Sequence, residues 1–144
     1  MTILNYIKDL AGIGAPKISV EGAERVARPG DVLRGVVVLE GGDHEVTVHE
    51  VTVRLEEQRL TYTAPVPTED PERLPLRTLA HVRLDLAQQA LVSGQRIERR
   101  FELPVPAQLE PSEGPLGHAL VAEAELAGIN PVAILPMTIL PSDA

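Results

Sequence analysis

The sequence contains no cysteine and no tryptophan, and its 144 residues include only one phenylalanine and two tyrosines. Without cysteine, the chain can form neither a disulfide scaffold nor a thiolate metal site. So few aromatic rings offer no surface on which nucleic-acid bases or sugars could stack. The hydrophobic core must therefore be built from valine, leucine, isoleucine and alanine.

Positive charge is also scarce. Thirteen Lys and Arg stand against 21 Asp and Glu, which gives a formal net charge of −8, and the basic residues form no stripe. A phosphate backbone would be repelled, so we do not expect nucleic acid as a partner. No stretch approaches the ~20 apolar residues of a membrane span, and the first residues lack the features of a signal peptide. We expect a cytoplasmic protein that does not insert into membranes.

Turn-forming residues, in contrast, are abundant, with 13 Pro and 11 Gly. In the segment Arg28 to Gly42, a Pro-Gly turn leads into a β-branched run that a Gly-Gly pair ends. Such a unit is typical of short antiparallel strands. The length predicts a single domain, residues 1–144, with a sandwich over 17–140.

Alternation of apolar and polar residues predicts an all-β fold, an immunoglobulin-like antiparallel β-sandwich of seven or eight strands. The expected strands cover residues 17–22, 31–40, 45–63, 76–86, 96–103, 118–126 and 132–140. The expected core includes Leu33, Val37, Val53, Val82, Leu84, Phe101, Leu120 and Leu126. Residues 2–11 have apolar side chains at helical spacing instead, which predicts one short amphipathic N-terminal helix.

Three segments depart from the simple pattern. The strand 45–63 changes phase twice, so we expect a bulge or turn near His49-Glu50 and a second break around Glu57-Gln58. Arg99 falls on the apolar parity of its strand. Because a buried unpaired guanidinium would be prohibitive, we expect it to be paired or to snorkel to a margin. Residues 64–75 hold four prolines and no apolar face, which predicts an exposed hairpin loop.

The histidines do not have the spacing of a metal site. His44 and His49 are five residues apart among strand-forming residues, whereas the zinc signature needs histidines at i and i+4 of a helix. His81 and His118 are isolated, and we expect each to point outward or to lie near a strand end. The sequence therefore predicts no metal ligands.

The serines and carboxylates also lack a catalytic arrangement. No serine sits in a tight glycine elbow; Ser112, for example, belongs to a Pro-rich turn. An acid–base pair needs two environments that separate the pKa values of its members. The clusters Glu56-Glu57 and Glu69 to Glu72 are expected on exposed surfaces as solvated charges. We predict no catalytic residue, no cofactor and no enzymatic activity.

Four pieces of the chain, in order and at characteristic spacing, resemble one family. They are Gly12 to Ile18, Arg28 to Val38 with Gly41-Gly42, Ser93 to Ile97 leading into Phe101 to Pro104, and Pro111 to Pro115. The chain resembles the N-terminal half of the bacterial sporulation-control proteins, distant relatives of arrestins, over roughly residues 3 to 140. The resemblance implies an arrestin-like sandwich with a non-catalytic regulatory or scaffolding role. The family typically carries a second sandwich and has an apolar residue in place of Arg99.

The last predicted strand, 132–140, has Thr138 as its only polar side chain. A strand without a polar face must be covered on both sides, and Pro136 suits an edge position. We therefore expect an interaction surface formed by Val132, Ile134, Met137, Ile139, Ile3 and Ile7. Three functions compete: a regulatory module that binds another protein, a structural protein that self-associates into a homo-oligomer through this strand, and a hydrolase or small-ligand enzyme, which the lack of a catalytic arrangement disfavours.

Overall fold

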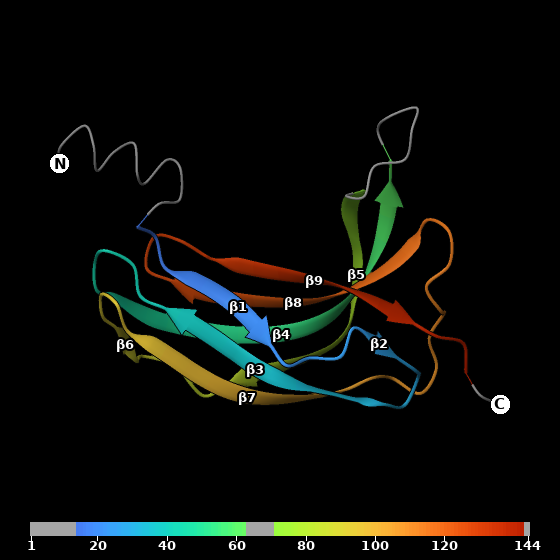
Figure 1. Cartoon of the computed structure of the whole chain (residues 1–144), viewed down its shortest axis with the longest axis horizontal. Coiled ribbons are helices and arrows are strands. Elements are labelled where there is room, and N and C mark those ends of the chain that lie inside the picture. Colours follow the sequence, from blue (N-terminus) through green and yellow to red (C-terminus); the bar gives the residue numbers. More distant parts are fainter. Residues whose placement is uncertain (1–13, 63–70, 143–144) are drawn as a thin grey trace.

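A computed structural model of the chain describes residues 14–62 and 71–142. They form nine strands and no helix (Figure 1). The strands are β1 (Lys17–Glu21), β2 (Val26–Ala27), β3 (Val32–Glu40), β4 (Val46–Thr61), β5 (Glu72–Leu84), β6 (Ala90–Leu91), β7 (Arg96–Pro104), β8 (Leu116–Leu126) and β9 (Val132–Ile139). The helix predicted for residues 2–11 lies outside the described residues. The two-residue strands β2 and β6 account for the excess over the predicted number.

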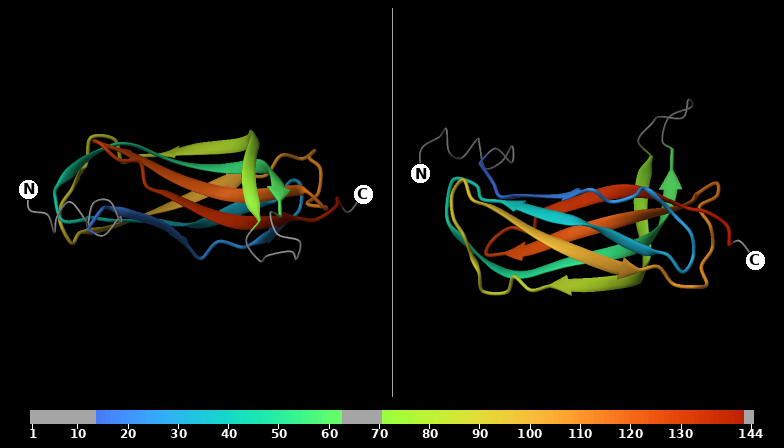
Figure 2. Two further views of the ribbon diagram at one scale, coloured as in Figure 1. Left: turned by 90° about the horizontal axis from the view of Figure 1, so that it is seen from above. Right: turned by 60° about the horizontal axis from the view of Figure 1, so that its bottom comes forward.

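The strands form two sheets that share one core. The smaller sheet has the order β1-β3-β7, and the larger has the order β2-β9-β8-β4-β5, with β6 pairing to β4. Figure 2 shows the two layers from two further directions. All pairs are antiparallel except β2 and β9, which run parallel. The all-β prediction is confirmed, but its wholly antiparallel pairing is wrong at this one short pair.

Side chains from both sheets meet in a single cluster of buried residues. Seven of the eight core residues predicted from the sequence are buried there, and Val82 is only half-buried. Val82 belongs to β5, which ends the larger sheet and so has a neighbouring strand on one side. Among the described residues, no helix has the length and apolarity that a membrane crossing needs.

Strand β4 contains the irregularities that its sequence predicted. Its pairing with β8 shifts between Val48 and Glu50, and its pairing with β5 shifts after Leu55 and again after Glu57. The first shift leaves His49 of β4 without a partner in β8 and changes which β4 residues face the core, whereas at the other two shifts the unpaired residues are Leu79 and Leu76 of β5. From Glu50 onward β4 pairs with β8 without a break, so Glu56 and Gln58 share the outer face of the larger sheet with Arg54 and lie opposite Ala119 and Gly117.

The loop predicted for residues 64–75 is shorter than expected. Residues 72–75 belong to β5 and pair with Gln58 to Thr61 of β4. Backbone pairing does not require apolar side chains, and Pro75 is tolerated because β5 is an edge strand. Figure 1 shows this end of the β4–β5 pair projecting from the body of the molecule. The rest of the predicted loop, residues 64–70, lies outside the described residues.

Arg99 is paired, as expected. Its Nη1 donates to the Glu98 carbonyl oxygen at 2.9 Å and its Nη2 to the Gln89 side-chain oxygen at 3.3 Å, and the residue is half-buried. The polar partners lie close to the strand itself. The guanidinium therefore keeps hydrogen bonds without entering the core.

Val38 lies on the outer face of the smaller sheet, yet it is fully buried. Arg96 of β7 bonds Glu98 on its own strand, Glu40 on β3 and Glu21 on β1. The register places Val38 on the diagonal between Arg96 and Glu21. We infer that the long Arg96 side chain crosses the sheet and covers this valine, as aliphatic stems of arginines often do.

Gly35 allows β3 to approach its neighbours closely. A Cβ atom at this position would lie 3.0 Å from two ring atoms of Phe101 and 3.1 Å from the Glu21 carbonyl oxygen. We expect Gly35→Val to destabilise the protein by about 1–3 kcal/mol, because the side chain would overpack the core. Urea unfolding measures the change. Ser19→Val, on an exposed strand position, should change stability little; equal losses in both variants would contradict this explanation.

Candidate functional site

The predicted interaction surface divides between the two faces of β9. Val132 and Ile134 have 46% and 51% of their surface exposed, whereas Met137 and Ile139 have 5% and 1%. Odd- and even-numbered residues of a strand point to opposite faces, so these two pairs cannot form one surface. The inclusion of Met137 and Ile139 was therefore wrong, because both belong to the core. Ile3 and Ile7 lie outside the described residues.

Strand β9 has a neighbouring strand on only one side along most of its length. It pairs with β8 along residues 132–137 and with β2 only at Thr138 and Ile139. Pro136 thus lies where β2 does not pair, which fits a residue without an N–H donor. On the outer face, the exposed side of β9 runs from Val132 and Ile134 through Pro136 to Thr138. We call these four residues the β9 strip.

Next to the β9 strip, a chain of polar contacts crosses the outer face of the larger sheet. Arg54 bonds Glu123 at 2.8 Å and Glu56 at 3.0 Å. Gln58 donates from Nε2 to Glu56 at 3.0 Å and accepts from Arg73 Nη1 at 2.8 Å. We call these five residues the polar chain. Together they connect β8 to the start of β5.

The middle of the polar chain is withdrawn from solvent. Gln58 is 1% exposed and Glu56 6%. Partial burial lowers the pKa of Arg54, but hydrogen bonds to Glu123 and Glu56 outweigh burial, so the pKa lies above its ordinary value. Arg54 therefore carries a fixed positive charge between two carboxylates. The prediction that Glu56 is a solvated surface charge was wrong, because Arg54 and Gln58 bond its carboxylate on the outer face and the residue is buried.

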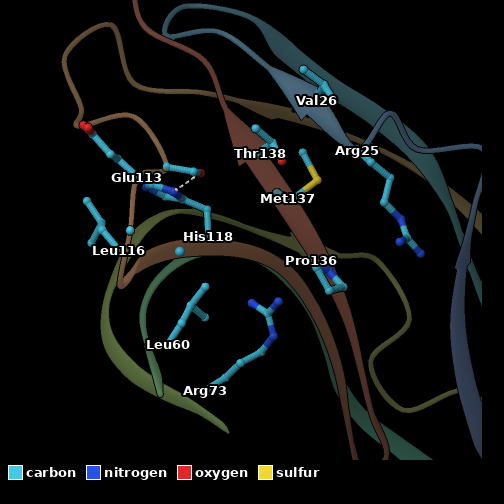
Figure 3. Close-up of a pocket in the computed structure, with 13 residues that line it drawn as sticks. Arg25, Val26, Leu60, Arg73, Glu113, Leu116, His118, Pro136, Met137 and Thr138 are labelled. Carbon is cyan, nitrogen blue, oxygen red and sulfur yellow. Dashed lines mark hydrogen bonds between the residues drawn. The ribbon is translucent and has the colours of Figure 1, made fainter. Parts of the chain in front are cut away.

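A pocket of about 500 Å³ lies where the polar chain meets the end of the β9 strip (Figure 3). Its lining includes Arg25 and Val26 at β2, Leu60 and Arg73 of the β4–β5 pair, and Gly117, His118, Pro136, Met137 and Thr138 of β8 and β9. Ser112, Glu113 and Gly114 of the loop before β8, with Leu116 at the start of β8, complete the lining. Figure 3 shows the guanidinium groups of Arg25 and Arg73 on the two sides of Pro136.

Neither arginine of the pocket is neutralised within the described part of the chain. Arg73 bonds only the amide oxygen of Gln58, which is neutral, and Arg25 has no side-chain partner there. Other arginines are paired with carboxylates, as Arg34, Arg77 and Arg83 are. Glu113 is the one carboxylate residue that lines the pocket. On a chain with net charge −8, this is a local concentration of positive charge.

His118 lies near the start of β8, which is one of the two expected positions, but its side chain is buried and does not point outward. The side chain has 0% exposure and lies on the core face, opposite Glu57 and Met137. Its Nδ1 is 2.7 Å from Ser112 Oγ, which also accepts the Ile139 N–H at 2.9 Å. Ser112 was likewise predicted in a loop without a role. Sequence spacing could not reveal this pair, because the loop returns to β9 before β8 begins.

The hydrogen bond between Ser112 Oγ and His118 Nδ1 can form with either ring tautomer, because a hydroxyl group can donate or accept. The other ring nitrogen, Nε2, is buried and has no hydrogen-bond partner among the described residues. Burial lowers the pKa of His118, while the charge of Glu57 opposes this shift. The folded protein therefore holds this histidine neutral.

A neutral buried histidine makes folding stability depend on pH. Because the folded-state pKa is below the unfolded value, the unfolded chain binds the extra proton first, and stability falls as pH drops below about 6.5. We expect His118→Gln to reduce this fall, which has a limiting slope of about 1.4 kcal/mol per pH unit. Urea unfolding between about pH 7.5 and 5 measures it.

The matched control is His81→Gln, because His81 is exposed. This variant should keep the pH slope of the unmodified protein. If His118→Gln and the unmodified chain lose stability in parallel as the pH falls, His118 is not the group that titrates.

The remaining candidate groups do not converge. His44, His49 and His81 are exposed, and Glu72 is exposed at the start of β5. Glu69 and Asp70 lie outside the described residues. Within residues 14–62 and 71–142, no three His, Asp or Glu side chains gather closely enough to hold a metal ion. The pocket beside the β9 strip, which two arginines and one glutamate line, is therefore the candidate functional site.

Comparison with known proteins shows which family the chain belongs to. A family model described as Spo0M, SpoOM protein, matches residues 6–126. The chain belongs to this family. The resemblance seen in the sequence is thereby confirmed. A search of curated proteins gave no match.

A solved Spo0M structure has the same fold. The crystal structure of Spo0M, a sporulation control protein from Bacillus subtilis, superposes with a TM-score of 0.70 at 18% sequence identity. The match covers 88% of this chain and 50% of that one. The present chain thus spans about half the length of that relative, and at this identity the likeness concerns the fold.

Proposed function

We propose that this chain is a regulatory module of the Spo0M type that works without catalysis by binding another protein through the β9 strip. Family membership supports the regulatory role. The two-layered β fold supports the arrestin-like class that the sequence suggested. A cytoplasmic location is part of the same proposal.

The observation that carries the proposal is the exposure of two large aliphatic side chains on one strand face. Val132 and Ile134 are two residues apart on β9, so they point the same way, and about half of each is in water. Val26, 50% exposed, pairs with Thr138 and extends the apolar character toward the pocket. Contiguous exposed apolar residues of this kind are typical of protein interaction sites.

The Ser112–His118 pair does not support the competing function of a hydrolase. Ser112 Oγ is held by Ile139 and His118, and the histidine is fully buried. A nucleophilic serine needs an accessible oxygen, with the histidine oriented by a third group. Among the described residues Nε2 has no partner, so no third group orients the ring. The bonds of Ser112 to Ile139 and His118 instead hold the loop against β9 and β8.

Self-association through the same strip is the second candidate. It follows from the same exposed residues, since an apolar strand face with a partly free edge can bind a second copy. Analytical ultracentrifugation over a wide concentration range distinguishes it. A monomer at every concentration excludes self-association. Growth that Ile134→Lys abolishes favours it over a separate partner.

The proposed function is tested with Ile134→Lys. Burying an isoleucine in an interface contributes about 1.5–3 kcal/mol, so a lysine there should weaken partner binding about tenfold or more. The measurement is capture from extracts of the cells that make the protein, followed by affinity determination with the purified partner.

Val92→Lys is the matched control, because Val92 is 43% exposed and follows β6, outside the β9 strip. It should bind as the unmodified protein does. Equal losses in both variants, or no loss in Ile134→Lys, would refute binding through the strip.

A further inference from the structure

The pocket at the end of the β9 strip contains more positive charge than the described residues neutralise. Arg25 and Arg73 flank Pro136 and have no carboxylate partner within the described residues. Like charges near one another repel, and a cleft with an excess of one charge sign attracts ions of the other sign. Their position at the end of an exposed apolar strip suggests that the neutralising group comes from outside.

A series of hydrogen bonds with buried residues holds the Arg73 side chain in place. Its Nη1 donates to Gln58, whose other end donates to Glu56, and Glu56 is in turn bonded by Arg54. Gln58 is almost completely buried, so this support has little freedom. A guanidinium has five N–H donors, and one contact leaves the others available. Arg73 is thus pre-oriented toward the pocket with most of its donors unused.

The surroundings of the two arginines are shaped by small or apolar residues. A Cβ on Gly117 would lie 2.8 Å from atoms of the Leu60 side chain, so the glycine lets Leu60 lie against β8. Pro136 and Val26 add further apolar surface. Low polarity beside a guanidinium strengthens its interaction with an anion. The pocket therefore suits one acidic group attached to an apolar segment.

We propose that this pocket binds the carboxylate of an aspartate or glutamate in an extended segment of the partner protein, while the neighbouring apolar residues of that segment cover the β9 strip. The inference rests on the proposed function and adds the chemistry that the partner must present. Arg25 and Arg73 would share the carboxylate through charge-assisted hydrogen bonds.

Charge complementarity favours a carboxylate over a phosphate. Glu113 lines the same pocket, and Glu56 lies behind Arg73. A phosphate group, with a charge of about −1.5 to −2, would meet stronger repulsion from these residues and from a chain of net charge −8. A carboxylate carries a single charge, and because the guanidinium fork matches carboxylate and phosphate alike, this smaller charge decides the preference.

The test uses two capped pentapeptides of alternating apolar residues, one with a central glutamate and one with glutamine. Binding to the full ¹⁵N-labelled chain is followed by the amide signals of Val26 and Thr138, which line the pocket. We expect the glutamate peptide to bind at least about fivefold more tightly, with the preference decreasing as salt is added. Sodium phosphate is titrated in parallel.

Arg73→Gln and Arg25→Gln should each abolish the preference for glutamate. Arg100→Gln is the matched control: it removes one equal charge from an exposed arginine on β7, outside this pocket, and should leave the preference intact. Because Arg25 is exposed and has no side-chain partner in the described chain, its replacement tests the pocket without disturbing the fold.

Three results would overturn the inference. They are equal binding of both peptides, a preference that survives in Arg73→Gln and Arg25→Gln, and phosphate displacing these signals at lower concentration than the glutamate peptide. The two proposals fail separately. If Ile134→Lys loses the partner while both peptides bind alike, protein binding stands and the carboxylate pocket fails. If the glutamate preference holds but Ile134→Lys keeps the partner, the strip fails as the docking surface.

Discussion

The burial of β8 on both faces constrains the rest of this molecule. Leu120 and Ala122 face the shared core, while Ala119 and Val121 on the opposite face are equally inaccessible, at 0% and 1% exposure. A strand inside a two-layered β protein normally has one face in water. With no further layer among the described residues, the side chains of neighbouring strands must supply the cover. The outer face of β8 therefore carries small side chains, and the long polar side chains of β4 cover them.

The polar chain covers the outer face of β8 and also positions Arg73 at the pocket. Arg54 lies opposite Val121 in the register and reaches Glu123, so an ion pair spans the two strands above small side chains. An exposed ion pair contributes little, but these partners are largely withdrawn from water and hydrogen-bonded in series. The last member of the series is Arg73. The contacts that cover β8 therefore also fix the charge at the pocket, so the stability of the sheet is linked to the proposed binding surface.

Periodicity predicted most of the fold because it reports burial directly. It located Phe101 and Leu120 in the core and placed the phase breaks of β4 near the residues where the register shifts. It failed where the structure depends on long-range pairing. The parallel contact of Val26 with Thr138 and the return of Ser112 to β9 involve segments 27 residues or more apart in sequence. No local pattern marks such contacts, so the burial of His118 could not be foreseen.

The candidate site was predictable only in its apolar half for the same reason. A strand with no polar face shows itself in sequence, and Val132 and Ile134 were identified on that basis. The register then decided which half of β9 faces water, because side chains alternate. Arg25 and Arg73 are 48 positions apart in the numbering and lie in unremarkable contexts. Because this chain has an excess of acidic residues, it repels acidic partners at long range. In the proposed mode of binding, the two arginines attract an acidic group only at the pocket, so the position of that group in the partner matters as well as its charge. An acidic segment can be held only where its apolar neighbours also fit the β9 strip, and this double requirement is what would make recognition specific.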